Sequence, residues 1–239
     1  MEFQAFLFDL DGTLIDFDPD EFIRRYLGAA SQYFIDLIPN PQSFIKEILS
    51  STEVMENNDN ESNTALEDFL LDFCPKFNAD CREIKQRFLQ FYQTKFDVIK
   101  PIITPIDGAK ELILNIRKKI PKAKIILATN PVFPLVSIER RVEWGGLSPN
   151  YFDYITHAEN SKFCKGNRKY WFEILDLIKK KPSETLVIGN DGLRDMEAKK
   201  YGFKTFFLES TLENEDRITE ETTPDFRGSI KDLSNILFN

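Results

Sequence analysis

Apolar positions follow two different spacings along this chain. Phe6, Leu7 and Phe8 are consecutive apolar residues, a run typical of a buried strand. From about residue 17 to residue 99, apolar side chains instead recur every three or four positions, as in amphipathic helices. Asp18 followed by Pro19 predicts where the first helix begins, because Asp is a good N-cap and Pro suits the first helical position. The spacing predicts four helices and one polar loop here, at about 19–37, 42–55, 65–73 and 81–96, and at 56–63.

After an extended segment at 100–105, helical and strand patterns alternate. The predicted strands lie at 123–128, 154–156, 185–188 and 204–208, and the predicted helices at 109–119, 134–144, 170–180, 194–200 and 230–238. Such alternation predicts a parallel sheet with helices on both faces. The expected fold is therefore a Rossmann-like α/β core domain formed by residues 1–16 and 100–239. Residues 17–99, the helical insertion, would form a second, α-helical domain whose apolar stripes are expected to be core.

Length and charge indicate a globular protein and disfavour a nucleic-acid-binding one. With 239 residues and 42% hydrophobic content, the chain can bury a full core. A net charge of −8 disfavours a nucleic-acid partner, which would need a clustered basic surface. The basic runs 117–119 and 179–181 fall at predicted helix ends, where cations complement the helix dipole. An acidic protein that handles phosphate would therefore need a metal ion and a few placed cations.

The cysteines and the apolar runs indicate in which cellular compartment the protein is expected. Cys74, Cys81 and Cys164 are odd in number and widely spaced, which predicts neither a disulfide framework nor a zinc site. No signal peptide is apparent, and no apolar run approaches the roughly 20 residues that span a bilayer. We expect a cytoplasmic protein without a membrane partner.

Polar side chains follow three predicted strands at the point where each strand ends. The carboxyl ends of parallel strands meet at one edge of a sheet, where ligands bind, so these side chains are expected to lie close together. The first strand is followed by two acids, the second by a hydroxyl and an amide, and the third by two more acids: Asp9 and Asp11, Thr129 and Asn130, Asp191 and Asp195.

Asp9 and Asp11 are two apart after a strand, so their carboxylates leave it on the same side. Paired acids repel unless a cation or a shared proton relieves them, and Mg²⁺, which prefers oxygen ligands, is the obvious candidate. Asp11-Gly12 is by itself also a common turn signal. The other strand ends favour a site, because these residue types suit phosphoryl transfer. One carboxylate can attack phosphorus, a second can move protons, and a cation offsets the phosphoryl charge.

These motifs resemble those of the haloacid dehalogenase-like hydrolase superfamily. The first motif is Asp9-Leu10-Asp11-Gly12-Thr13, the second is Thr129 after its strand, the third is a Lys ahead of a helix, best matched by Lys165, and the fourth is the pair of acids that ends at Asp195. Their order and strand context agree with the family over essentially the whole chain.

The resemblance implies a role for each matching residue. Asp9 would be the nucleophile and Asp11 the general acid and base, while Thr129 and Lys165 would bind the transferring phosphoryl group. Mg²⁺ would be held by four residues, the side chain of Asp9, the backbone carbonyl of Asp11, and Asp191 and Asp195, the last directly or through water. The helical insertion resembles the family's cap domain, which closes over the site.

Two assignments stay open at this point. Lys162 is close enough to Lys165 to compete for the phosphate-binding role, and Gly166 stands where the family often has Pro. Asn130 either adds a substrate-binding donor to the phosphate or serves as a turn residue.

The leading hypothesis is a Mg²⁺-dependent phosphatase that hydrolyses a small phosphorylated metabolite through an aspartyl-phosphate. A phosphomutase is the nearest alternative, since it differs only in whether water or substrate receives the phosphoryl group. A dehalogenase is disfavoured because Asp11 is present, and a non-catalytic binding protein because no motif residue is missing. The residues predict no particular substrate and no particular oligomeric state.

Overall fold

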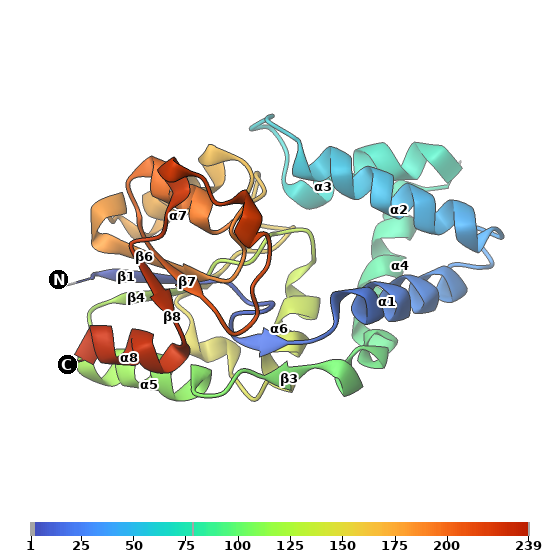
Figure 1. The fold of residues 1–239 in the computed structure, drawn as a ribbon. Coiled ribbons are helices and arrows are strands. Elements are labelled where there is room, and N and C mark those ends of the chain that lie inside the picture. Colours follow the sequence, from blue (N-terminus) through green and yellow to red (C-terminus); the bar gives the residue numbers. More distant parts are fainter. Residues whose placement is uncertain (1–2, 78, 239) are drawn as a thin grey trace.

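The computed structural model describes residues 3–77 and 79–238 and contains a six-stranded sheet (Figure 1). Every pairing in this sheet is parallel, and the strand order is β5-β4-β1-β6-β7-β8. The strands are β1 (Ala5–Phe8), β4 (Lys124–Leu127), β5 (Tyr154–Ile155), β6 (Thr185–Gly189), β7 (Lys204–Leu208) and β8 (Phe226–Gly228). The predicted Rossmann-like α/β class is confirmed.

Helices cover both faces of the sheet, as the alternating pattern predicted. They are α5 (Ala109–Lys119), α6 (Leu135–Trp144), α7 (Arg168–Ile178) and α8 (Ile230–Phe238). Side chains alternate along β1, so Phe6 and Phe8 join the core that includes α5, α6 and α8. Leu7 points the other way, into a smaller core with α7. In Figure 1, α5 and α8 lie on one side of the sheet and α7 on the other.

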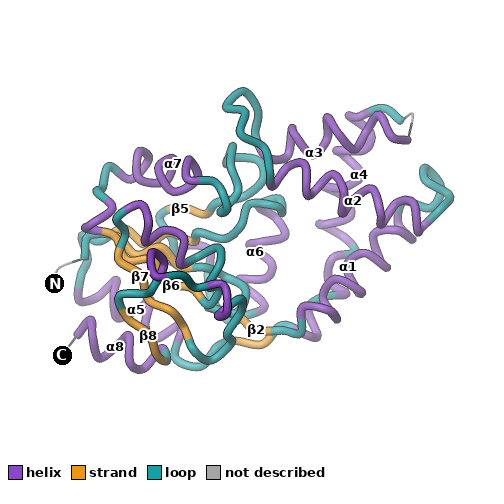
Figure 2. Tube along the Cα trace, turned by 45° about the horizontal axis from the view of Figure 1, so that its top comes forward, coloured by secondary structure: helices purple, strands orange, loops and turns teal. Residues whose placement is uncertain are grey.

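The helical insertion lies beside the sheet domain (Figures 1 and 2). It contains α1 (Pro19–Tyr33), α2 (Pro41–Glu56), α3 (Ala65–Phe73) and α4 (Cys81–Thr94). Asp18 caps α1, accepting hydrogen bonds from the backbone N–H groups of Asp20 and Glu21, so the predicted start is confirmed. Buried phenylalanines pack between these helices; the rings of Phe34 and Phe88, for example, are 4.6 Å apart. Phe suits such a core because it needs no hydrogen-bond partner.

The two connections between the insertion and the sheet domain pair with each other. β2 (Ile15–Asp16) and β3 (Thr104–Pro105) form an antiparallel ladder of two residues each. The extended segment expected at 100–105 therefore holds only in part, because it begins with a 3₁₀ turn. Short 3₁₀ segments lie at Cys74–Phe77, Phe96–Val98, Lys100–Ile102, Pro149–Tyr151, Pro182–Glu184, Met196–Tyr201, Glu215–Arg217 and Glu220–Thr222.

Two elements differ from the sequence pattern. The α-helix predicted at 194–200 is a 3₁₀ helix at Met196–Tyr201. It ends at Gly202, whose φ of 88° stops the helix. The segment is therefore short, and a short segment gains too few hydrogen bonds to offset the unfavourable nucleation of an α-helix. Strand β8 was not predicted, because three residues carry too little periodicity to mark a strand.

The cysteine expectation was wrong in one respect. Cys74 and Cys81 form a disulfide, with their Cα atoms 5.3 Å apart, while Cys164 is free and buried. Cys74 begins the 3₁₀ segment that follows α3 and Cys81 begins α4, and the spacing of the two cysteines in the sequence does not reveal that these elements lie so close. The cytoplasmic location stays a prediction. Within the described residues, we find no helix with the length and apolar character needed to cross a bilayer.

Candidate active site

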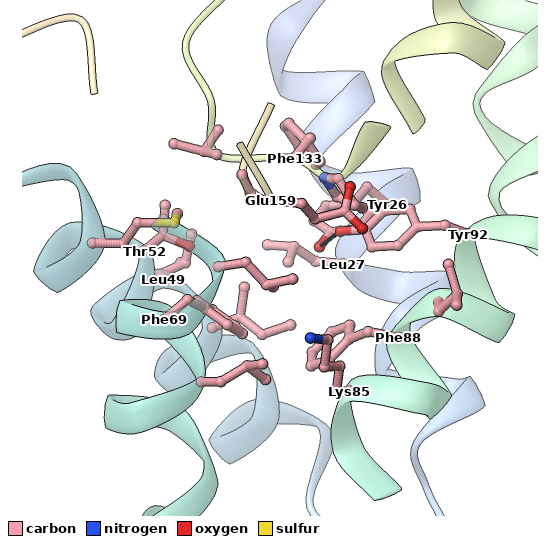
Figure 3. A pocket seen from close by; sticks show the side chains of 18 of the residues that line it. Tyr26, Leu27, Leu49, Thr52, Phe69, Lys85, Phe88, Tyr92, Phe133 and Glu159 are labelled. Atoms are coloured by element: carbon pink, nitrogen blue, oxygen red, sulfur yellow. Dashed lines mark hydrogen bonds between the residues drawn. The ribbon is translucent and has the colours of Figure 1, made fainter. Parts of the chain in front are cut away.

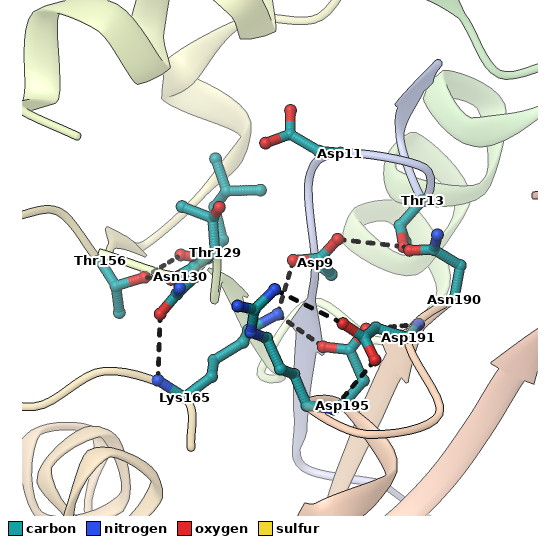
Figure 4. A network of polar contacts seen from close by, with 12 residues as sticks. Asp9, Asp11, Thr13, Thr129, Asn130, Thr156, Lys165, Asn190, Asp191 and Asp195 are labelled. Atoms are coloured by element: carbon teal, nitrogen blue, oxygen red, sulfur yellow. Dashed lines mark hydrogen bonds and ion pairs between the residues drawn. The ribbon is translucent and has the colours of Figure 1, made fainter. Parts of the chain in front are cut away.

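Three neighbouring strands end at a shared cavity. Phe8 of β1 lies in register with Leu127 of β4 and Ile188 of β6, so the residues that follow each strand emerge together. The cavity has a volume of about 260 Å³. All six acids, hydroxyls and amides predicted at the strand ends line it, together with Lys165: Asp9, Asp11, Thr129, Asn130, Asp191 and Asp195 (Figure 4).

Lys165 joins two of the predicted acids. Its ammonium Nζ donates to Asp9 Oδ1 and to Asp195 Oδ1, at 2.5 Å each, and its side chain is buried. Burial lowers the pKa of Lys165, but the carboxylates of Asp195 and Asp9 outweigh this effect and raise it above its ordinary value. Lys165 therefore remains a cation. Lys162 is exposed and its backbone N–H donates to Glu173, so the structure places Lys165 rather than Lys162 in the cavity.

The loop after β6 holds its two acids by backbone hydrogen bonds. Asp191 Oδ1 accepts from the N–H groups of Leu193 and Arg194 at 2.8 and 3.1 Å. Asp195 Oδ2 accepts from the N–H of Asp191 at 3.1 Å. Burial raises the pKa of Asp195, Lys165 opposes the rise, and Asp9 adds to it.

Gly189 explains how Asp195 fits against this loop. A Cβ atom at position 189 would lie 2.0 Å from Asp195 Oδ2, far closer than atoms can pack. The end of β6 therefore requires glycine, so that the Asp195 carboxylate can fold back onto the strand.

Asp11 has a partner that the sequence analysis missed. Its Oδ2 accepts a hydrogen bond from Nη1 of Arg141, on α6. Arg141 is buried, with its guanidinium 4.9 Å from the ring centre of Phe133 and 5.7 Å from that of Phe22. Burial raises the pKa of Asp11, and the Arg141 charge offsets part of the rise. Figure 4 shows the Asp11 carboxylate turned away from Asp9.

A signal for Arg141 was present in the helical pattern. Position 141 lies three residues after Ile138 and next to Val142, both of which are fully buried. It therefore falls on the apolar stripe of α6, where a charged residue needs a buried partner. The identity of that partner could not be read from the stripe.

Asn130 is engaged with protein groups rather than left free. Its Nδ2 donates to Glu56 Oε1 at 2.7 Å, and its Oδ1 accepts from the N–H of Lys165 at 3.1 Å. Arg194 Nη2 lies 3.2 Å from the same Glu56 oxygen. Glu56 ends α2, so these contacts tie the helical insertion to the sheet domain at the cavity. Thr129 lies behind them, 3% exposed, with its carbonyl accepting from Thr156 Oγ1 at 2.7 Å.

The cavity carries more negative than positive charge. Six carboxylates line it, the four predicted acids plus Glu56 and Glu213, against the two cations Lys165 and Arg194. Burial and then the nearby Asp191 raise the pKa of Glu213. Oxygen donors in this number suit a hard divalent ion, so the residue types fit Mg²⁺. Among the described residues, however, no three acidic, thiol or imidazole side chains converge on one point, because Lys165 lies between Asp9 and Asp195.

Comparison with known proteins agrees with this geometry. The family model described as "haloacid dehalogenase-like hydrolase" matches residues 3–201. That stretch contains every residue placed in the cavity except Glu213. The comparison with curated proteins finds no match.

Solved structures with the same fold cover nearly the whole chain. A structure described as a HAD phosphatase, from Thermococcus onnurineus, has a TM-score of 0.61 at 16% identity, covering 100% of this chain and 98% of that one. One assigned as a beta-phosphoglucomutase, from Thermotoga maritima, has a TM-score of 0.57 at 18% identity, covering 99% and 98%. YfnB from Bacillus subtilis, assigned as a HAD-hydrolase and bound to magnesium, has a TM-score of 0.57 at 19% identity, covering 99% of both chains.

Proposed function

Because this chain belongs to the haloacid dehalogenase-like hydrolase family, we propose that it is a Mg²⁺-dependent phosphatase that acts on a small phosphorylated metabolite. One observation carries the proposal: a buried ammonium, Lys165, lies 2.5 Å from both Asp9 and Asp195 at the carboxyl ends of adjacent strands. A carboxylate beside a fixed cation is suited to receive a phosphoryl group, because the cation offsets the charge of the phosphoryl oxygens.

In the proposed reaction, an Asp9 oxygen attacks phosphorus and the bond from phosphorus to the ester oxygen breaks. Asp11 gives its proton to the departing alkoxide, then takes a proton from the water that hydrolyses the aspartyl-phosphate. Lys165 holds the phosphoryl oxygens together with Thr129. When bound, Mg²⁺ would be held by Asp9, the backbone carbonyl of Asp11, and Asp191 and Asp195, and would neutralise charge on the phosphoryl group.

We further propose that residues 17–99 act as a cap over this reaction. Glu56 of α2 contacts Asn130 and Arg194 across the cavity at 2.7 and 3.2 Å, so the insertion reaches the catalytic groups. A cap that closes in this way excludes water before chemistry. With Glu56 in place, the amide of Asn130 supports the closed position. On substrate binding, we propose that the Asn130 amide turns from Glu56 to the phosphate. Glu56→Gln weakens the contact between Glu56 and Asn130, so a change in KM for p-nitrophenyl phosphate would show that this contact matters for substrate binding.

A phosphomutase is the second candidate. It is favoured by the Thermotoga maritima neighbour, which is assigned as a beta-phosphoglucomutase. The two functions differ in what receives the phosphoryl group. Phosphate release that needs no bisphosphate activator supports the phosphatase.

The test is release of phosphate from p-nitrophenyl phosphate with and without Mg²⁺. Asp9→Asn should lower kcat by about a thousandfold or more, as expected when a nucleophile is removed. Asp176→Asn is the matched control, since Asp176 is exposed on α7, outside the cavity, and it should keep the full rate. Equal rates for Asp9→Asn and Asp176→Asn would overturn the nucleophile assignment.

A further inference from the structure

A second and larger cavity lies next to the catalytic one. Its volume is about 450 Å³, within the roughly 300–1,000 Å³ of small-molecule sites. Thr52, Val132 and Phe133 line both cavities, so the larger cavity is adjacent to the one that holds the carboxylates. It lies between the helical insertion and the loop after β4 (Figure 3).

The walls of this second cavity are almost entirely apolar. All four helices of the insertion contribute, and the aromatic lining residues are Tyr26, Phe69, Phe88, Tyr92 and Phe133. The hydroxyl groups of Tyr26 and Tyr92 lie 2.7 Å apart and hydrogen-bond each other. They are therefore already paired. The apolar stripes form core as expected, and several of their core residues, such as Tyr26 and Phe88, also line this space.

Several lining residues are apolar yet exposed. Ile23, Leu49 and Leu89 are exposed by 43, 50 and 43%, and all three face this cavity. Polar lining is concentrated on α4, where Arg82, Lys85 and Gln86 are exposed. The cavity thus has an apolar body, the charged catalytic groups at one end, and exposed side chains of α4 at its rim.

From this arrangement we infer that the substrate is a phosphomonoester of an apolar aliphatic alcohol, whose hydrocarbon chain occupies the second cavity. The inference rests on the proposed phosphatase function and names its substrate class. With the phosphate beside Asp9, the ester's carbon chain passes Thr52 and Phe133 into the apolar space. There it covers Ile23, Leu49 and Leu89, which removes apolar surface from water.

A sugar or nucleoside phosphate fits this cavity poorly. Its hydroxyl groups would leave water for walls that offer few hydrogen-bond partners, and burial of an unpaired polar group is unfavourable. Charged and polar side chains lie at the catalytic end, at the rim on α4, and at Glu159 beside the loop after β4. The body of the cavity therefore selects against polar leaving groups.

The test is a homologous series of alkyl phosphates, ethyl to octyl, each below its critical micelle concentration, with phosphate release measured in the presence of Mg²⁺. kcat/KM should rise about fourfold per methylene, equivalent to about 0.8 kcal/mol for each buried CH₂, until the chain fills the cavity. Glucose 6-phosphate should be no better than ethyl phosphate.

A matched pair of variants locates the effect. Leu49→Ser replaces a lining residue of α2, and it should lower the octyl-to-ethyl ratio of kcat/KM by about fifteenfold, the loss of about two buried methylenes. Leu71→Ser makes the same change on α3 at a residue that is 64% exposed and outside the cavity lining. Leu71→Ser should leave the ratio unchanged.

The outcomes separate the two proposals. Asp9-dependent phosphate release with a flat kcat/KM from ethyl to octyl, or faster turnover of glucose 6-phosphate than of octyl phosphate, overturns the substrate class alone. An equal fall of the ratio in Leu49→Ser and Leu71→Ser does the same. Phosphate release from none of the esters overturns the phosphatase, and the substrate class with it.

Discussion

Arg141 should be coupled energetically to Asp11, and Arg141→Met tests this. Methionine keeps an unbranched apolar stem between Phe22 and Phe133 but removes the guanidinium that donates to Asp11. The Arg141 side chain is only 1% exposed, whereas that of Asp11 is 34% exposed. The variant therefore leaves a partly solvated carboxylate without its cation.

The expected cost follows from three contributions. Loss of one partner from a fully buried ion pair costs about 3–5 kcal/mol, and the partial exposure of Asp11 lowers that figure. Nε and Nη2 of Arg141 have no hydrogen-bond partner among the described residues, so methionine also relieves a desolvation penalty of about 1–3 kcal/mol. Loss of the two ring contacts adds about 0.5–2 kcal/mol. We expect Arg141→Met to lower the free energy of unfolding by about 1–3 kcal/mol.

The assay is urea unfolding of the wild type, Arg141→Met, Asp11→Asn and the double variant. In the Asp11→Asn background, Arg141→Met should cost at least about 1 kcal/mol less, because no carboxylate is left unpaired. Arg140→Met is the matched control. Arg140 pairs on the surface with Asp97, whose side chain is 63% exposed, and such pairs contribute about 0–1 kcal/mol.

Catalysis provides an independent measurement. Arg141 does not line the catalytic cavity, and its hydrogen bond to Asp11 is its direct link to a catalytic group; methionine keeps an apolar contact with Phe133. With p-nitrophenyl phosphate, Arg141→Met should therefore lower kcat and leave KM nearly unchanged. An equal unfolding cost in both Asp11 backgrounds, together with an unchanged kcat, would refute the coupling.

Two further predictions concern packing and pH. Gly189→Ala should displace the Asp195 carboxylate and lower the free energy of unfolding by about 1–3 kcal/mol. The control, Gly28→Ala, lies in α1 with open space at its Cβ and should raise the free energy of unfolding by up to about 1 kcal/mol. Thermal unfolding of both variants checks this, and a more stable Gly189→Ala than Gly28→Ala would contradict it. Partial burial raises the pKa of Asp153, but the N–H of Ile125 and the Arg117 guanidinium outweigh burial and hold the pKa below its ordinary value. This stabilisation is present above the unfolded pKa of about 3.9 and is lost as pH falls through the lowered pKa. Asp153→Asn should thus lower the free energy of unfolding by about 1–2 kcal/mol at pH 7 and by progressively less toward pH 3. Urea unfolding at each pH measures this, and a loss that does not change with pH would contradict a stabilising role for the ionised Asp153 carboxylate.

Local patterns were sufficient for most of the fold. The apolar run at 6–8, the helical spacing between residues 17 and 99 and the later alternation all reflect which face of an element is buried. Apolar residues recur at every helical turn or at every second residue of a strand, so each element of sufficient length gives several independent signs of its buried face. The pattern failed where an element was too short to repeat, as in β8 (Phe226–Gly228) and the 3₁₀ helix Met196–Tyr201.

The candidate site was predictable because its residues follow strands. In a parallel sheet the strand ends share one edge, so Asp9, Thr129 and Asp191 could be grouped without knowing any distance. Lys165 was one of two candidates until the structure placed its ammonium between Asp9 and Asp195.

The sequence by itself determined the fold class, the strand ends and the types of chemical group that meet there, because these depend on local periodicity and on the geometry of a parallel sheet. The tertiary structure alone decided which groups touch across the chain. Arg141 reaches Asp11 from 130 residues away, Cys74 forms a disulfide with Cys81, and part of each apolar stripe lines a cavity as well as packing in the core. An apolar stripe is the same in sequence whether a neighbouring helix or a ligand covers it, since only the packing of distant segments determines which one does.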